Sequence, residues 1–396
     1  MRTGFALLLT LLITSLVNAQ SNYWMQVDSV NGPGKSVATS FALNGNGYIV
    51  GGLTAQDFTR KMYSYSPSGD DWDDELSWGG ETGSGQNRGS AISFVINEKA
   101  YVGLGQGNSA LYYRDLWSYD PVTETWTQLA DFEGSARHGA VAFANNDYGF
   151  VGTGQSAAGL EKDFYRFDPA TNTWLQLNDF PGTARKFATA CTMGAEAYLC
   201  TGDDGVLKND IWQYLPATDT WVQKTSMPLA GRVGAVSWGI FPYLFVATGE
   251  DPNGQFLNDV WAYNFWLNNW YPKVPLPASG RTHATAFVVS NVAYLATGYN
   301  NGSYFDDCWA YFAELSSGEM DLPEISLFPN PAVDELRWDP TGEFQTLRIV
   351  NTNGEVLMET SAETGSVTVS ELPPATYFAQ FTNVHGKNSV TPFVKQ

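Results

Sequence analysis

Six basic residues recur at nearly even steps along this chain of 396 residues, and their regularity makes them the first candidates for chemistry. They are Lys35, Arg88, Arg137, Arg185, Arg232 and Arg281. Guanidinium groups bind carboxylates and phosphates through paired hydrogen bonds, so a ring of such residues predicts an anion-binding site. The alternative is that a residue present in every repeat serves the repeat itself and ties neighbouring units together.

The elements that must position these residues repeat with the same step. Six tryptophans mark six copies of one supersecondary unit: Trp24, Trp72, Trp126, Trp174, Trp221 and Trp270. In each unit a small-residue stretch follows the basic residue, and then come an apolar run ending in glycine, an alternating aromatic stretch and the next tryptophan. These stretches predict four short strands, with small residues near a crowded axis and aromatic residues at the wide outer edge. The pattern predicts an all-β fold, a β-propeller closed into a ring.

The ends of the repeat array predict how the ring closes. Trp24 belongs to a fourth strand with no three strands before it. Trp309 and Tyr311 form a third strand that no further tryptophan follows. We therefore expect the N-terminal strand to complete the last blade, which gives six blades within residues 20–315.

The units resemble kelch repeats, which carry a glycine pair, a spaced tyrosine and a tryptophan. Gly51-Gly52 is such a pair, and later units carry degenerate forms such as Gly103-Leu104-Gly105 and Thr201-Gly202. The resemblance covers about residues 21–315 and implies a six-bladed kelch-type β-propeller. In such scaffolds the function lies in the loops of one face. Kelch adaptor proteins use arginines at this register to capture acidic peptides, so the resemblance implies an anionic peptide or glycan as the ligand of the basic ring.

A five-residue extension between Trp72 and Arg88 places Trp78 on the face expected to hold the basic ring. An aromatic residue on an inserted loop is suited to stacking on a sugar or contacting a protein, and the alternative is that it caps the edge of its blade. The predicted ligand-binding residues are thus the six basic residues and Trp78. The predicted function is a protein- or glycan-binding module, and a structural or adhesion role without a small ligand is a further alternative.

An enzymatic alternative rests on a second resemblance. Exported six-bladed kelch proteins include sialic acid mutarotases, whose Gly-Glu segment resembles Gly249-Glu250. In that alternative Glu250 is a general acid/base, although the arginine that follows in the family is absent from Gln255-Phe256-Leu257. The copper oxidases of kelch type need two histidines and tyrosines around the metal, and the registers of His138 and His283 do not match each other. We expect no metal, no cofactor and no catalysis.

The two termini predict export. Arg2, the apolar stretch from Phe5 to Val17 and the small-residue site ending at Ala19 predict a signal peptide over residues 1–19. After a polar linker over residues 316–324, residues 325–396 resemble the type A C-terminal sorting domain of type IX secretion in the Bacteroidetes. The matching residues are Phe328-Pro329-Asn330-Pro331, Asp334, Leu336, Asn353-Gly354, Leu372, Tyr377 and Lys395. The resemblance implies a small β-sandwich, the type IX secretion machinery as a partner, and a secreted or outer-membrane surface location.

Composition excludes two classes of partner. The formal net charge of −20 offers no basic footprint for a nucleic acid. No stretch after the signal peptide is long and apolar enough to span a membrane. Cys191 and Cys200 fall on adjacent expected strands, where they form either a cross-strand disulfide or two buried thiols.

Overall fold

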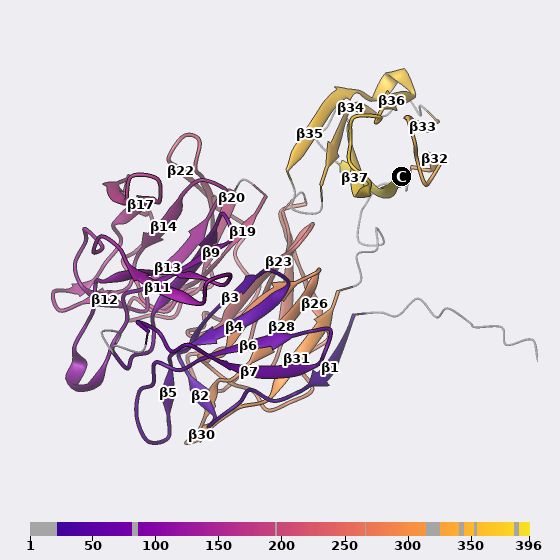
Figure 1. The fold of residues 1–396 in the computed structure, drawn as a ribbon. Helices are drawn as coiled ribbons and strands as arrows, with labels where there is room; N and C mark the ends of the chain where they lie inside the picture. The colour runs from indigo at the N-terminus through magenta and orange to yellow at the C-terminus, as the bar shows by residue number, and fades with distance from the viewer. Residues whose placement is uncertain are drawn as a thin grey trace, which may run out of the picture.

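The computed structural model describes residues 22–80, 86–194, 196–265, 267–313, 325–339, 344–351, 355–383 and 388–396 (Figure 1). The expected signal peptide over residues 1–19 and the expected linker over 316–324 lie outside this range. Asn353-Gly354 of the sorting-domain pattern also lies outside it.

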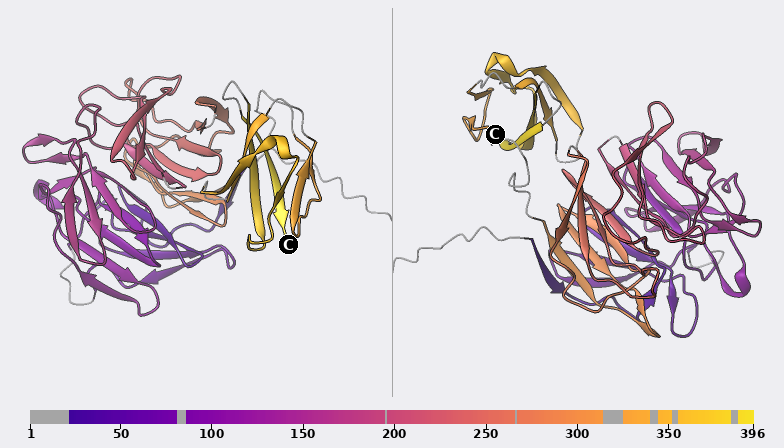
Figure 2. Two further views of the ribbon diagram at one scale, coloured as in Figure 1. Left: turned by 90° about the horizontal axis from the view of Figure 1, so that it is seen from above. Right: turned by 180° about the vertical axis from the view of Figure 1, so that it is seen from behind.

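Six antiparallel four-stranded sheets form the blades of a β-propeller (Figure 2). Blade 1 comprises β3 (Thr39–Leu43), β4 (Asn46–Val50), β6 (Met62–Ser66) and β7 (Asp71–Glu75). Blade 2 comprises β8 (Ile92–Ile96), β9 (Lys99–Gly103), β10 (Leu116–Asp120) and β11 (Thr125–Gln128). Blade 3 comprises β13 (Val141–Ala144), β14 (Gly149–Gly152), β17 (Phe164–Asp168) and β18 (Thr173–Gln176).

The remaining three blades repeat this meander. Blade 4 comprises β19 (Thr189–Met193), β20 (Glu196–Cys200), β21 (Ile211–Leu215) and β22 (Thr220–Lys224). Blade 5 comprises β23 (Val236–Ile240), β24 (Tyr243–Ala247), β25 (Val260–Asn264) and β26 (Asn269–Lys273). Blade 6 comprises β27 (Thr285–Val289), β28 (Val292–Ala296), β31 (Cys308–Phe312) and β1 (Tyr23–Val27). The pairing of β1 with β31, with Trp24 opposite Tyr311, confirms the predicted ring closure.

Short two-residue strands lie on one face of the propeller. β2 (Lys35–Ser36) pairs with β5 (Leu53–Thr54), and β29 (Tyr299–Asn300) pairs with β30 (Ser303–Tyr304). β15 (Gln155–Ser156) lies between β12 (Arg137–His138) and β16 (Gly159–Leu160). We call this side, which carries the second-to-third and fourth-to-first connections of the blades, the upper face.

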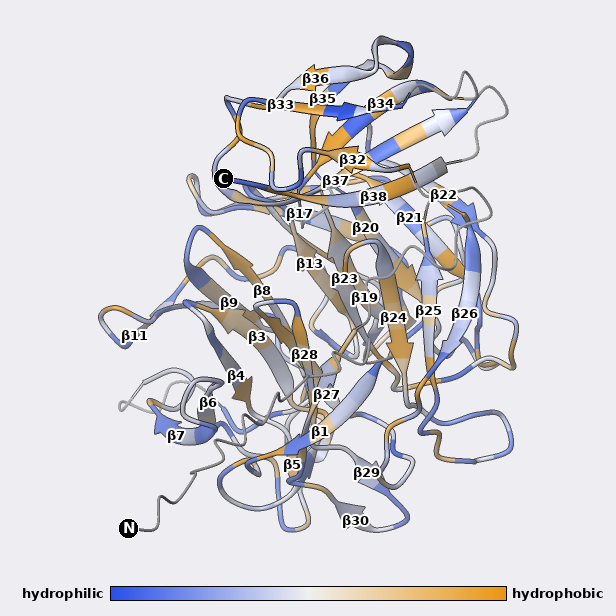
Figure 3. Cartoon of the chain, turned by 90° about the vertical axis from the view of Figure 1, so that its right-hand side faces the viewer, coloured by the Kyte–Doolittle hydropathy of each residue, from blue (hydrophilic) through white to orange (hydrophobic). Residues whose placement is uncertain are grey.

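The first strand of every blade lines the central channel with small side chains. Six alanines at equivalent positions form one layer of this lining: Ala38, Ala91, Ala140, Ala188, Ala235 and Ala284. Larger apolar and aromatic side chains fill the junctions between neighbouring blades in six separate clusters. Figure 3 shows the result, with inner strands such as β24 coloured hydrophobic and the outer strand β7 coloured hydrophilic. The size gradient predicted from the sequence is therefore present.

The periodic tryptophans tie neighbouring blades together. In five of them the indole Nε1 donates to a backbone carbonyl of the neighbouring blade at 2.7–3.3 Å. The accepting residue always lies four positions after the periodic tryptophan of that neighbouring blade. Trp126, for example, donates to the Leu76 carbonyl at 3.0 Å. The indole nitrogen of Trp221 has no partner in the described part of the chain.

This difference between tryptophans gives a matched test of the inter-blade tie. We expect Trp126→Phe to lower the free energy of unfolding by about 1 kcal/mol more than Trp221→Phe, because only Trp126→Phe leaves a carbonyl without its donor. Urea unfolding of both variants measures the difference. Equal losses would show that the indoles act through packing alone.

The cysteines are free thiols in the structure. Cys191 lies opposite Tyr198, and Cys200 lies opposite Thr189, so the two thiols are not cross-strand partners. Burial raises the pKa of the Cys191 thiol to about 12. The disulfide alternative is therefore not the one that this structure adopts.

The C-terminal domain is a small β-sandwich. One sheet comprises β32 (Leu327–Phe328), β33 (Glu335–Trp338) and β36 (Ser366–Thr368). The other comprises β35 (Val356–Ser361), β34 (Phe344–Val350), β37 (Ala375–Asn383) and β38 (Asn388–Lys395). Phe378 packs on Phe241 of the propeller with 5.0 Å between ring centroids. Because Phe241 follows the first strand of blade 5, this contact lies on the face opposite the upper face.

Candidate functional site

All six periodic basic residues are buried, and the five arginines among them pair with an aspartate of their own blade. Each arginine donates from Nη2 to an aspartate of the same blade at 2.8–2.9 Å and from Nη1 to a backbone carbonyl at 2.9–3.2 Å. The pairs are Arg88–Asp115, Arg137–Asp163, Arg185–Asp210, Arg232–Asp259 and Arg281–Asp307. The arginine side chains are 0–1% exposed.

This placement corrects the expectation of a cationic ring that is open to a ligand. Nη1 and Nη2 of each guanidinium are already bonded within the blade, and an aromatic ring often covers the group, as Phe132 covers Arg137 at 5.0 Å. The Nη1 and Nη2 donors of such a buried ion pair become available to a ligand only if the pair breaks, which is costly. The geometry matches the alternative role in part: the repeated arginine serves its repeat, but the aspartate and the carbonyl that it bonds belong to its own blade and not to the neighbouring one.

Trp78 is also buried, with 0% of its surface exposed. It packs against the Arg88 guanidinium at 4.3 Å and against Trp126 at 6.4 Å. A side chain in this position cannot stack on a sugar, so the expectation of an exposed loop aromatic is wrong. Trp78 instead caps the edge of its blade.

Lys35 departs from the arginine pattern. Its side chain is buried at 1% exposure, and its Nζ has no hydrogen-bond partner in the described residues. The amine lies 4.0 Å from the centre of the Tyr63 ring. Burial lowers the pKa of Lys35 to about 8, against the opposing field of Asp74 and Asp306. Blade 1 is therefore electrostatically unlike the other five.

A closed ring of backbone hydrogen bonds surrounds the axis at the upper end of the channel. It is made by the residue two positions after each basic residue, and its members are Val37, Ser90, Gly139, Phe187, Gly234 and His283. Each N–H donates to the carbonyl of the preceding blade's member at 2.7–3.4 Å, and Val37 closes the circle by donating to His283. All six have a positive φ of 48–64°, in the left-handed region that few residues other than glycine adopt.

Two side chains of this ring cover the channel mouth. Phe187 and His283 belong to blades 4 and 6, yet their rings meet edge-to-face at 4.6 Å across the glycine of blade 5. A Cβ at Gly139 would lie 2.9 Å from the Phe187 ring, and one at Gly234 would lie 2.8 Å from His283 Nδ1. Glycine at these two positions therefore makes room for the aromatic pair.

Polar groups from blades 3 and 4 adjoin this pair. His138 packs edge-to-face on Phe187 at 5.4 Å and stacks on Tyr112 of blade 2 at 4.9 Å. The Lys186 ammonium donates to Gln155 Oε1 at 2.6 Å and lies 5.7 Å from the Phe187 ring centre. We call the six residues Tyr112, His138, Gln155, Lys186, Phe187 and His283 the mouth cluster.

Both histidines of the mouth cluster are neutral at physiological pH. Burial lowers the pKa of His138 to about 4, and the Lys186 charge adds to this effect. Burial also lowers the pKa of His283 to about 4, with smaller contributions from His138 and Lys186. His138 Nδ1 and His283 Nε2 have no hydrogen-bond partner among the described residues. A neutral imidazole can accept from or donate to a hydroxyl group, depending on its tautomer.

Glu250 of the enzymatic alternative lies on the same face. It occupies in blade 5 the position that Gln155 has in blade 3, since the backbones of both residues pair with the residue after the periodic arginine. Its side chain is half-buried. Blade 5 lies between the blades of Phe187 and His283, so Glu250 borders the mouth cluster in register.

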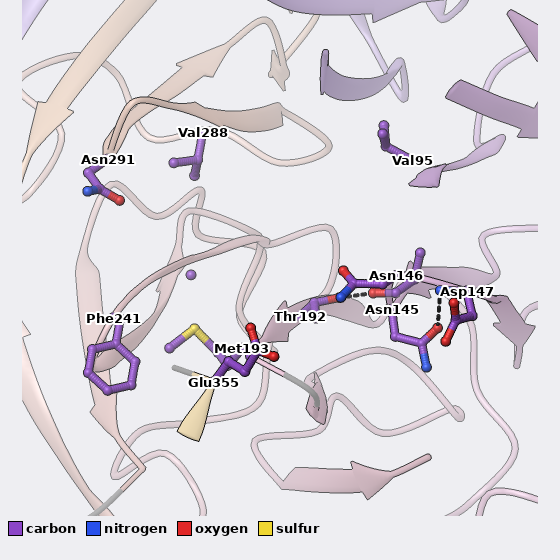
Figure 4. Close-up of a pocket in the computed structure, with 13 residues that line it drawn as sticks. Val95, Asn145, Asn146, Asp147, Thr192, Met193, Phe241, Val288, Asn291 and Glu355 are labelled. Carbon is purple, nitrogen blue, oxygen red and sulfur yellow. Dashed lines mark hydrogen bonds between the residues drawn. The ribbon is translucent and has the colours of Figure 1, made fainter. Parts of the chain in front are cut away.

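The opposite channel mouth contains the larger cavity, of about 590 Å³ (Figure 4). Asn145 there accepts from the backbone N–H groups of Asp147 and Tyr148, and Thr192 donates to the Ala144 carbonyl. Glu355 of the C-terminal domain also lines this cavity. Its polar groups are thus partly committed to the protein's own turns, which makes the upper mouth cluster the better candidate.

Comparison with known proteins supports export and the fold. Residues 326–396 match the model of the secretion system C-terminal sorting domain. No curated protein matches the chain. A solved structure titled "Structure of YjhT" aligns with a TM-score of 0.59 and 19% identity, covering 71% of this chain and 95% of that chain. At this identity the likeness concerns the fold alone.

The chain is therefore an all-β protein of the propeller class with a C-terminal secretion sorting domain. That domain implies engagement of the type IX secretion machinery and delivery to the exterior or the cell surface. Within the described ranges, no helix has the length and apolarity needed to cross a bilayer. In the same part of the chain, no group of three or more His, Cys, Asp or Glu side chains could hold a metal ion.

The positions that follow the periodic arginines carry a sequence signal for the mouth cluster. Lys186, Phe187, His138 and His283 all lie one or two positions after a periodic arginine. Those two positions vary widely from blade to blade, whereas the periodic position itself is always arginine or lysine. In a repeat protein, the residues that differ between repeats are the ones expected to carry the function of that particular protein.

Proposed function

We propose that this protein is an exported kelch-type propeller that binds a glycan at the mouth cluster. The observation that carries the proposal is the convergence of aromatic rings and two neutral imidazoles from separate blades on one channel mouth, where one nitrogen of each imidazole has no hydrogen-bond partner among the described residues. Ligand sites combine an apolar surface with a few placed polar groups. Hydroxyl groups match the two imidazoles, and the apolar face of a sugar ring matches Phe187.

The local charge supports a sugar with no more than one carboxylate. The mouth cluster contains one cation, Lys186. The acidic residue Asp203 pairs with Lys186 through the backbone, and the acidic residue Glu250 lies in the next blade. The net charge of −20 also disfavours a strongly acidic peptide, because long-range repulsion slows the approach of an anion. A neutral glycan or a sugar acid is therefore the ligand class that we propose.

Binding to an immobilised panel of neutral glycans and uronic or sialic acids tests the proposal. We expect Phe187→Gly to weaken binding by about tenfold or more, because it removes the stacking surface. Glycine suits the positive φ of 52° at this position and already stands at two other positions of the ring. The backbone should therefore tolerate the change. Unchanged binding in Phe187→Gly, or no binding by the wild-type protein to any sugar, would reject the proposal.

An enzymatic variant of the same site is favoured by one observation, the position of Glu250 on the upper face of blade 5, between the blades that carry Phe187 and His283. If the protein is a mutarotase for an acidic sugar, Glu250 exchanges a proton with the anomeric hydroxyl group. NMR exchange spectroscopy on free sialic acid measures the rate of anomer interconversion. Acceleration that Glu250→Gln abolishes would support this variant, and binding without acceleration would leave a binding module.

A further inference from the structure

Blade 1 lacks the carboxylate that neutralises the basic residue in the other five blades. In those blades the aspartate immediately precedes the third strand. Its backbone carbonyl accepts a hydrogen bond from the backbone N–H of one further residue, and the carbonyl of that same residue accepts from the arginine Nη1. In blade 1 this backbone position belongs to Lys61, whose carbonyl accepts the equivalent bond from Gly51 at 2.9 Å. A lysine thus stands where five aspartates stand.

In the other five blades, the carboxylate at this position is partly exposed to solvent. In blades 2 to 6 the arginine side chain is 0–1% exposed, whereas its aspartate partner is 17–32% exposed. The cation is therefore the inner member of each pair and the carboxylate the outer member. The Lys61 side chain is exposed on this outer side of blade 1.

Nearby groups do not replace the missing partner of Lys35. Asp74 and Asp306 act on its amine through space, and Nζ has no hydrogen bond within the described residues. Arg60 is adjacent in sequence to Lys61, but its Nη1 donates to the carbonyls of Trp78 and Gly80. A buried amine without an acceptor is unfavourable until an anion reaches it.

We infer that blade 1 is a receptor for a carboxylate supplied from outside the chain, which binds Lys35 in the place of the missing aspartate. The group comes from a free small acid or from an acidic side chain of a peptide. This site is distinct from the mouth cluster, because Lys35 belongs to blade 1 whereas the residues of the cluster belong to blades 2, 3, 4 and 6. The inference does not depend on glycan binding.

Thermal unfolding of the full chain in acetate and in chloride of equal ionic strength tests the inference, because a ligand that binds only the folded state raises the unfolding temperature. A second arm replaces acetate by the peptide acetyl-Gly-Asp-Gly-amide and so distinguishes the two sources. We expect a saturable rise with at least one of these probes in the wild-type protein. Lys35→Met should weaken the apparent binding constant by about tenfold or more, since it removes a charge-assisted hydrogen bond.

Lys61→Asp is the matched variant, because it restores the carboxylate within the chain. We expect it to raise the unfolding temperature without added anion and to abolish the response to both probes. Phe187→Gly should respond like the wild-type protein. No response in the wild-type protein, or an equal response in Lys35→Met and Lys61→Asp, would overturn the inference.

Discussion

Replacing Asp163 by alanine is expected to lower the free energy of unfolding by about 3–5 kcal/mol, because the change leaves the buried Arg137 guanidinium without its counter-charge. Arg137 is 0% exposed, and it shares two hydrogen bonds with this carboxylate. Urea unfolding followed by tryptophan fluorescence measures the loss. The effect should be of similar size for the equivalent aspartate in blades 2, 4, 5 and 6.

Asp179→Ala is the control for this prediction. Asp179 pairs with Lys162 in the same blade-3 region, but the two side chains are 50% and 49% exposed and their charged atoms are 3.9 Å apart. An exposed pair of this kind contributes less than about 1 kcal/mol. If Asp163→Ala and Asp179→Ala cost the same, the arginines do not stabilise the blades in the way described. That result would instead support arginine side chains that are free to bind an anionic ligand.

Stability is expected to fall steeply as the pH is lowered from about 6.5 to 4, because of the two histidines of the mouth cluster. Their pKa of about 4 in the folded protein lies below the ordinary value of 6.5. In this window the unfolded chain takes up protons that the folded protein does not. Protonation therefore favours unfolding, by up to about 3 kcal/mol for each histidine. Above pH 6.5 both histidines are neutral in the folded and in the unfolded protein, so this penalty is absent there and grows as the pH falls toward 4.

His138→Phe isolates this effect from the titration of carboxylates over the same range. Phenylalanine keeps the stack on Tyr112 and removes the titrating group. We expect the difference in unfolding free energy between pH 7 and pH 4.5 to shrink by about half of the histidine contribution. An unchanged pH dependence would show that His138 is already protonated, or freely solvated, in the folded protein.

The fold was predictable because each blade repeats a local pattern. The tryptophan step defined six units, and the unmatched strands at Trp24 and Trp309 predicted the closure that β1 and β31 make. Packing within a unit depends on residues less than one repeat apart. The small-residue channel and the aromatic outer strands follow from the same local periodicity.

The structural role of the arginines was one of two alternatives that the arginine spacing alone left open, and a second set of residues decides between them. Asp115, Asp163, Asp210, Asp259 and Asp307 follow the arginines by 25–27 residues, so their period is as regular as that of the arginines. A basic residue and an acidic residue that recur together predict an internal pair. The absence of the aspartate at Lys61 was visible in the same comparison.

The mouth cluster depends on contacts that no local pattern encodes. Phe187 and His283 are nearly a hundred residues apart, and they meet only because the ring closes and because Gly234 between them has no side chain. The pKa of each histidine depends on that burial. Sequence periodicity fixed the ring position of these residues but not the direction of their side chains.

The most direct test of the account compares imidazole and guanidinium ¹⁵N NMR signals of the full chain during titration with glycans and sugar acids. We expect a bound sugar to shift the signals of His138 Nδ1 and His283 Nε2, which have no hydrogen-bond partner among the described residues. The buried guanidinium signals of Arg137 and Arg185 should not change. Shifts of the arginine signals without any change at the two histidines would contradict the account and place the ligand at the arginine ring.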